Sequence, residues 1–172
     1  MGEIMLADLA HLDDYMALSV DLQIRMHSIP AVGFPEQKDK LIHNITAAPC
    51  LEKKWRQKVI MQLQNLETGS CLCHGDYHVL NLIMTSQGLK IIDLADISSG
   101  SASADACRSY LLYLIYRKDI AEIYLDHYCR RAGTDRQEIL QWLPVVAAAR
   151  LYENVTEEDI KMLKNLIVCG VS

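Results

Sequence analysis

The chain has 172 residues, of which 51% are apolar and 23% are charged, and this length and composition are typical of one globular domain. Its net charge is −5 and its Lys and Arg residues form no dense cluster, which argues against nucleic acid as a main partner and suits a cationic small molecule. The chain opens with no secretory signal pattern and contains no apolar run of about 20 residues, so we expect a cytoplasmic protein without a membrane span.

The first third of the chain is predicted to be helical. Apolar residues recur at helical spacing over residues 5–28, and Pro30 stops the run. Residues 34–49 are predicted to form an irregular connection with one short helical turn around residues 38–45. A clean apolar stripe with basic residues off it then predicts an amphipathic helix over residues 51–66.

The central segment, residues 71–96, combines short apolar strands with polar loops. Residues 72–73 and 82–84 are predicted strands, residues 86–88 a turn, and residues 89–92 a returning strand. Polar side chains in the first loop and after the last strand would therefore gather at one end of a small β-ribbon: His74, Asp76, His78, Asn81 and Asp93.

The last part of the chain is predicted to be helical again. Residues 98–103 are small and are expected to form a flexible segment. Helices are predicted over residues 107–115, over residues 120–127 with an end near Gly133, and over residues 135–150 with a break at Pro144. Thr156, followed three residues later by Asp159, predicts the capped start of a final helix.

The polar residues of the central segment suit phosphoryl transfer. Magnesium that bridges nucleotide phosphates prefers carboxylate and amide oxygens, which Asn81 and Asp93 could supply. The acceptor hydroxyl needs a carboxylate that orients it and accepts its proton, and Asp76 is the candidate.

These residues also carry a family resemblance. The run HGDYHVLN at residues 74–81 resembles the H-G-D-x-x-x-x-N catalytic loop of the aminoglycoside phosphotransferase and choline kinase-like family. The run IID at residues 91–93 resembles the metal-binding segment of that family, and residues 100–105 are similar to its G-x-x-x-x-D run. Residues 22–28 are similar to the helix end that precedes the core of the catalytic lobe.

The resemblance implies a single α+β, mainly helical domain over residues 1–172, a C-terminal lobe of protein-kinase type whose small β-ribbon carries the catalytic and metal-binding loops. It implies Mg²⁺-dependent transfer of the γ-phosphoryl group of ATP or GTP to a hydroxyl of a small acceptor, such as an aminoglycoside or choline. Asp76 would be catalytic, Asn81 and Asp93 would hold the metal, and Ile92 would contact the nucleotide. Three further residues would support these loops: His74, His78 and Asp105.

The chain departs from this family at its start. Residues 1–6 resemble the hinge between two kinase lobes, and no glycine-rich loop or V-A-I-K-like strand precedes them. We therefore expect a lobe without its nucleotide lid. The uncovered lobe interface would be apolar and would favour self-association or binding to a partner N-terminal lobe.

Three alternatives remain open on the sequence alone. One is a non-catalytic remnant or binding module with a kinase-lobe fold. Another is a metal-dependent phosphohydrolase whose ligands are His74, Asp76, His78 and Asp93. The third is a zinc site at Cys71 and Cys73 beside the histidines, although alternate strand residues reach poorly around one ion, and we expect all six cysteines to be reduced thiols.

Overall fold

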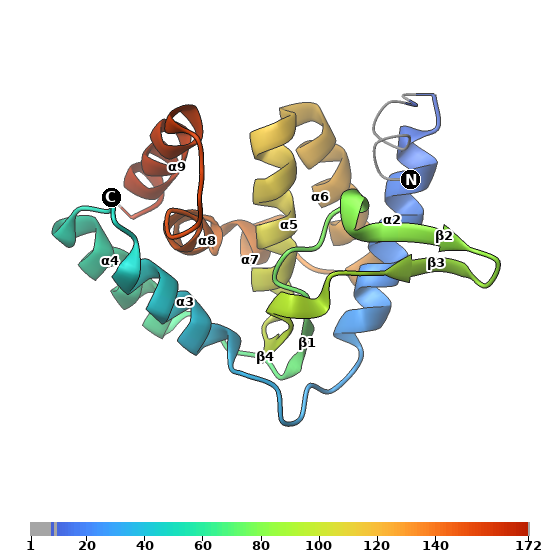
Figure 1. The fold of residues 1–172 in the computed structure, drawn as a ribbon, viewed down its shortest axis with the longest axis horizontal. Coiled ribbons are helices and arrows are strands. Elements are labelled where there is room, and N and C mark those ends of the chain that lie inside the picture. The colour runs from blue at the N-terminus through green and yellow to red at the C-terminus, as the bar shows by residue number, and fades with distance from the viewer. Residues whose placement is uncertain (1–7, 9, 172) are drawn as a thin grey trace.

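A computed structural model describes residue 8 and residues 10–171, which form a mainly helical fold with two small antiparallel sheets (Figure 1). This content agrees with the predicted α+β, mainly helical class. The expected hinge at residues 1–6 lies outside the described residues.

The first three described helices are α2 (Leu12–His27), α3 (Gln37–Ala47) and α4 (Lys53–Asn65). Helix α2 begins at Leu12, so the described residues 8, 10 and 11, which were predicted to be helical, lie before it. Its first turn carries Asp13 and Asp14, whose negative charges suit the positive end of a helix dipole. The prediction of an irregular connection with one helical turn at residues 38–45 is wrong, because α3 is a full helix. Its single buried residue, Ile45, packs into the core. The weak local pattern did not predict a full helix, and the packing of α3 against α8 stabilises it.

One of the two sheets is the predicted hairpin, and the other joins strands that are distant in the sequence. Strands β2 (Leu82–Thr85) and β3 (Gly88–Ile91) form the predicted hairpin, with Leu82 opposite Ile91. Strand β1 (Cys71–Cys73) instead pairs with β4 (Ser98–Gly100), a segment that we expected to be flexible. That expectation is wrong, since β4 is buried throughout. Its small side chains permit close packing: a Cβ atom at Gly100 would lie 2.3 Å from the Gln37 side chain.

The C-terminal helices follow the predicted pattern closely. They are α5 (Ala102–Tyr116), α6 (Lys118–Ala132), α7 (Arg136–Leu140), α8 (Leu143–Arg150) and α9 (Glu157–Gly170). Gly133 ends α6 in the left-handed conformation, and Pro144 lies in the first turn of α8, after the predicted break. Thr156 caps α9 by accepting a hydrogen bond from the Asp159 backbone N–H at 3.2 Å.

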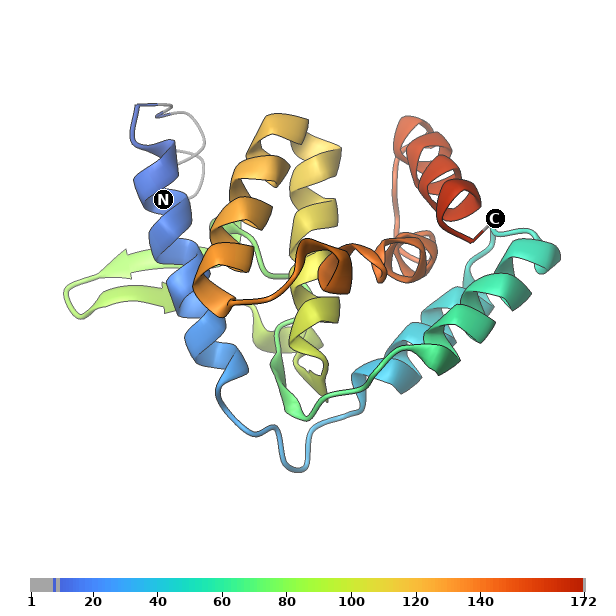
Figure 2. The same ribbon diagram turned by 180° about the vertical axis from the view of Figure 1, so that it is seen from behind.

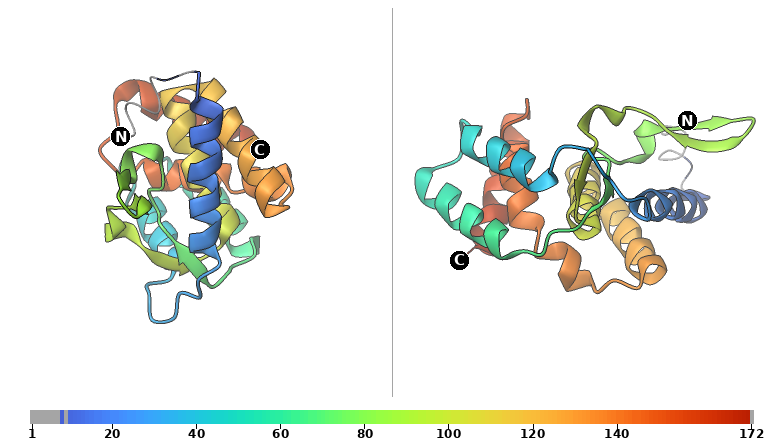
Figure 3. Two further views of the ribbon diagram at one scale, coloured as in Figure 1. Left: turned by 90° about the vertical axis from the view of Figure 1, so that its right-hand side faces the viewer. Right: turned by 90° about the horizontal axis from the view of Figure 1, so that it is seen from below.

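Two helical groups share one core. Helices α2, α5 and α6 stand side by side, while α8 packs against α3, α5 and α9 (Figure 2). The core between them is filled by fully buried side chains such as Met16, Leu111, Tyr124, Leu125 and Val145. The β2–β3 hairpin extends away from these helices at one end of the molecule (Figures 1 and 3). Among the described helices, none is both long enough and apolar enough to cross a membrane.

Candidate active site

The loop between β1 and β2 is anchored by a buried carboxylate on α5. One oxygen of Asp105 accepts the backbone N–H of Gly75 at 2.7 Å, and the other accepts that of His74 at 3.2 Å. His27 Nε2 at the end of α2 lies 2.9 Å from the same carboxylate. Burial alone would raise the pKa of Asp105, but His27 and the two backbone donors outweigh it and lower the pKa. Asp105 therefore stays ionised and holds both α2 and the loop.

Gly75 is required at its position for two reasons. Its φ is +83°, in the region that side chains avoid, and a Cβ atom there would lie 2.9 Å from the Asp96 carbonyl oxygen. The absence of a side chain lets the loop pass close to the short helical turn at Leu94–Asp96.

Asp76 follows immediately and is half-buried between two potential cations. Arg108 Nη2 from α5 lies 3.2 Å from Asp76 Oδ1, and His78 Nε2 lies 3.4 Å from Asp76 Oδ2. Burial would raise the pKa of Asp76, but the hydrogen bond from His78 and the charge of Arg108 together lower it to about 2. Asp76 is thus a carboxylate at every physiological pH.

Asn81 links this loop to the metal-binding segment proposed from the sequence. Its side-chain Nδ2 donates to the Asp76 carbonyl oxygen at 2.9 Å, which turns the amide nitrogen inward and leaves Oδ1 as the oxygen available to a ligand. Its own backbone carbonyl accepts the N–H of Ile92 at 2.9 Å. Asn81 and Asp93 therefore meet at the same end of the hairpin, as the sequence predicted.

Asp93 itself adopts an uncommon backbone conformation. Its φ is +59°, and it is the one non-glycine residue with positive φ in the described part of the chain. Its side chain is solvent-exposed at the end of β3. Such strained positions concentrate at functional sites, where the surrounding structure holds a side chain in a required direction.

His74 and His78 have different environments. The His74 ring is buried: Nε2 donates to the Ile92 carbonyl at 3.1 Å and Nδ1 accepts the Asp76 N–H at 3.2 Å. With both ring nitrogens engaged, His74 has none left for a metal, which weakens the phosphohydrolase alternative. His78 is half-buried and contacts both Asp76 and Asn81, each at 3.4 Å.

Several exposed apolar side chains lie on the hairpin and its adjoining turns. Ile92, the predicted nucleotide contact, is 38% exposed, and Met84 on β2 is 52% exposed. We call the exposed apolar residues of the hairpin and its adjoining turns the ribbon patch: Leu80, Ile83, Met84, Ile92 and Leu94.

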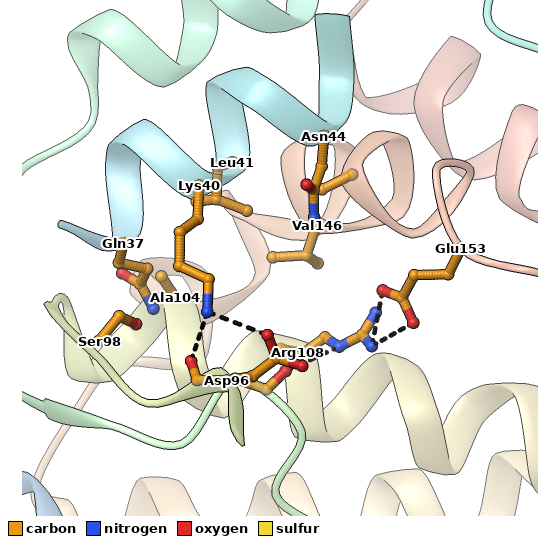
Figure 4. A pocket seen from close by; sticks show the side chains of 12 residues that line it. Gln37, Lys40, Leu41, Asn44, Asp96, Ser98, Ala104, Arg108, Val146 and Glu153 are labelled. Atoms are coloured by element: carbon orange, nitrogen blue, oxygen red, sulfur yellow. Dashed lines mark hydrogen bonds and ion pairs between the residues drawn. The ribbon is translucent and has the colours of Figure 1, made fainter. Parts of the chain in front are cut away.

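A pocket of about 80 Å³ opens next to the anchored loop, between α3, α5 and α8 (Figure 4). Lys40 Nζ crosses it from α3 to the Asp96 carbonyl at 2.7 Å and carboxylate at 3.0 Å. On the other side, Arg108 joins Asp76 to Glu153, whose carboxylate lies 2.9 Å from Arg108 Nη2. Leu41, Val146 and other apolar side chains complete the walls.

Sequence reasoning missed Arg108, Lys40 and Glu153. Arg108 lies one turn beyond Asp105 on α5, so both side chains leave the helix on neighbouring faces toward the same loop. This i, i+3 spacing was the available signal for Arg108. Lys40 gave no such signal, and neither did the contact of Glu153 with Arg108, because the partners, Asp96 and Arg108, are distant in the sequence.

The described residues contain no group of three or more His, Cys, Asp or Glu side chains arranged to hold a metal by themselves. Magnesium in nucleotide sites is commonly held by one or two protein ligands together with phosphates and water. An amide oxygen and a carboxylate at one end of the hairpin fit that pattern.

Comparison with known protein families identifies a matching family. The sequence model of the phosphotransferase enzyme family matches residues 2–142. Neither the comparison with curated proteins nor the comparison with solved structures returned a match.

Proposed function

Because the chain belongs to the phosphotransferase enzyme family, we propose that it forms the catalytic lobe of a protein-kinase-like enzyme that transfers the γ-phosphoryl group of ATP or GTP to a hydroxyl of a small acceptor. The observation that carries this proposal is the juxtaposition of Asp76, Asn81 and the Ile92–Asp93 segment at one end of the hairpin, beside a pocket.

Asp76 is proposed to act on the acceptor hydroxyl. A carboxylate with a pKa of about 2 is too weak a base to deprotonate a free alcohol. It can accept a hydrogen bond from the hydroxyl, point the oxygen at the phosphorus, and receive the proton once the new P–O bond makes that proton acidic. Asp76 is therefore mainly an orienting group whose protonation is late.

Asn81 and Asp93 are the proposed Mg²⁺ ligands, through Oδ1 and the carboxylate. Mg²⁺, when bound with the nucleotide, would neutralise the charge of the phosphates during transfer. The two residues are placed by different means: the Asn81 side chain by its hydrogen bond to Asp76, and the Asp93 backbone by the left-handed conformation after β3. Ile92 would offer an apolar contact to the nucleotide from the same segment.

The pocket is the proposed acceptor site. Its two carboxylates already face cations, since Asp96 pairs with Lys40 while Glu153 pairs with Arg108 and Arg150. The overall charge of −5 favoured a cationic acceptor, but this local balance favours a small neutral alcohol with several hydroxyls. Polar side chains at the rim, including Gln37 and Asn44, can bind such hydroxyls.

The nucleotide lid is proposed to come from an N-terminal lobe that covers the ribbon patch. Exposed apolar residues beside a polar site are typical of a surface that another domain or chain covers. Such a lobe would supply the phosphate-covering loop and the lysine that phosphotransferases of this type use.

The test is isothermal titration of the purified protein with Mg²⁺-ATP, alongside the Asp93→Ala variant and a matched Asp14→Ala control on the exposed face of α2. We expect binding by the wild type and the control, and at least about tenfold weaker binding by Asp93→Ala, because a metal ligand is lost. No binding by the wild type would favour a remnant or non-catalytic binding module. Equal binding by all three proteins would remove Asp93 from the metal site.

A further inference from the structure

Two cysteines lie side by side on the strand that leads into the anchored loop. Cys71 and Cys73 occupy alternate positions on β1, so their side chains share one face of the strand, and their sulfur atoms are 3.8 Å apart. Cys73 is directly followed by His74 and Gly75, whose backbone N–H groups donate to Asp105. Any change in the strand at Cys73 is therefore passed to the loop that carries Asp76.

The two thiols differ in a way that favours reaction between them. Cys71 is half-buried and lies near the surface, whereas Cys73 is fully buried. The contact with Cys73 lowers the pKa of Cys71 to about 7, against the opposing effect of burial. The same contact, together with burial, raises the pKa of Cys73. Cys71 is thus the nucleophile and Cys73 the neighbouring thiol.

The strand geometry lies at the edge of what a disulfide tolerates. Residues two apart on an extended strand have Cα atoms about 6.6 Å apart, near the upper limit of about 6.8 Å for disulfides. Closing the sulfur separation from 3.8 Å to a bond therefore requires β1 to shorten. The strand is bound on both sides, through its ladder with β4 and through Leu72 N–H, which donates to the Ile29 carbonyl at 2.8 Å. Shortening it must disturb these bonds and the loop that follows.

We propose that Cys71 and Cys73 form a reversible oxidation site, in which a peroxide converts the dithiol to an intramolecular disulfide that loosens the anchored loop. The consequence for phosphoryl transfer rests on the proposed function; the disulfide and its effect on the loop do not.

The reaction balances in two steps. The Cys71 thiolate attacks one peroxide oxygen; an S–O bond forms, the O–O bond breaks, and hydroxide leaves, so the sulfur is oxidised to a sulfenic acid and the peroxide is reduced. The Cys73 sulfur then attacks the Cys71 sulfur; the S–S bond forms, the S–O bond breaks, and the departing hydroxide takes the Cys73 proton to leave as water.

The experiment uses the full chain with Cys50 and Cys169 changed to Ser, because these two exposed thiols would otherwise link molecules together. The protein is treated with hydrogen peroxide under native conditions and mapped by mass spectrometry. Amide hydrogen exchange is then measured at His74 and Gly75. We expect a Cys71–Cys73 link, exchange at these two amides faster by at least about tenfold, and recovery of both after dithiothreitol.

The matched control carries Cys73→Ser in the same background and keeps Cys71. It should form no link between residues 71 and 73. Peroxide should also cause no dithiothreitol-reversible rise in amide exchange at His74 and Gly75. The proposal is overturned if peroxide that oxidises exposed Cys50 in the wild type leaves the pair reduced, or if the link forms with unchanged exchange at the loop. Titration of the reduced protein with Mg²⁺-ATP tests the proposed function separately.

Discussion

At the scale of single residues, Arg108 acts with His78 to lower the pKa of the proposed catalytic carboxylate. It donates to Asp76, to Glu153 and to the Gly75 carbonyl, which lies 3.2 Å from its Nε. It therefore joins the anchored loop to the wall of the pocket. Arg108 lines the pocket and holds Asp76 beside it.

We expect Arg108→Gln to raise the pKa of Asp76 from about 2 toward its ordinary value near 4, because a favourable positive charge is lost while the burial remains. NMR titration of the Asp76 carboxyl carbon measures this shift. Lys40→Gln is the matched control, since Lys40 pairs with Asp96 and not with Asp76. An unchanged Asp76 pKa in Arg108→Gln would mean that His78 alone holds it low.

Gly75 offers a second prediction at this scale. Gly75→Ala combines a disfavoured φ with a close approach to Asp96, so we expect it to lower the free energy of unfolding by about 1–3 kcal/mol. Urea unfolding followed by circular dichroism measures the loss. Gly88→Ala shares a positive φ but meets no atom within 4 Å, so it should cost less. Equal losses would show that the contact with Asp96 relaxes freely.

At the scale of elements, helix α5 and the end of α2 anchor the loop through a buried carboxylate. Asp105 receives the two loop N–H groups and His27, and Tyr128 on α6 contacts the other nitrogen of His27 at 2.8 Å. The loop and helix α2 thus bond directly to one buried carboxylate on α5, and α6 joins the cluster through His27. A polar cluster of this kind stabilises only while all its members remain paired.

Asp105→Asn should therefore destabilise the protein by about 2–4 kcal/mol, because loss of the carboxylate weakens its buried hydrogen bonds to His27 and to two backbone N–H groups. Urea unfolding at neutral pH measures the change. Asp13→Asn is the control: Asp13 also pairs with a histidine, but its side chain is 76% exposed, and we expect little change. A loss no larger than that of the control would contradict the anchoring role.

The Asp105 carboxyl also predicts how the stability of the fold depends on pH. The pKa of Asp105 is lower in the folded than in the unfolded protein, so its contribution to stability is fully present above the unfolded pKa of about 4. It is lost as the pH falls through the lower folded pKa. The wild type should lose stability steeply below about pH 4, and Asp105→Asn should lose less over the same interval, as thermal unfolding from pH 6 to pH 2 would show.

At the scale of the whole molecule, the ribbon patch is an exposed group of apolar side chains next to the candidate site. The hairpin extends away from the helices, and five of its apolar residues or their neighbours are exposed (Figure 1). A two-stranded ribbon is weakly stable by itself and presents unpaired edges. We infer that the patch is covered in use, by a lobe or by a second copy of the chain.

In the absence of a partner lobe, we expect concentration-dependent self-association through the ribbon patch. The double variant Ile83→Ser/Met84→Ser should shift the protein toward monomer, because the buried apolar area of the interface is lost. Sedimentation velocity over a range of concentrations measures this. Val32→Ser is the control, since Val32 is 89% exposed but lies in the connection after α2. A wild type that remains monomeric at every concentration would argue against self-association.

The sequence by itself determined the helices with strong apolar periodicity, the hairpin, the break at Pro144 and the cap at Thr156. It also determined the family and the candidate residues His74, Asp76, Asn81 and Asp93, because all of these depend on residues close together in the chain. Local spacing and turn chemistry are sufficient for such features.

Only the tertiary structure decided the rest. Helix α3 and strand β4 carry weak local signals, and each forms because distant elements pack against it. The pairing of Asp76 with Arg108, of Lys40 with Asp96 and of the two loop amides with Asp105 joins residues at least 30 positions apart. Such contacts form when helices pack together, and no local pattern encodes which charges will then face one another.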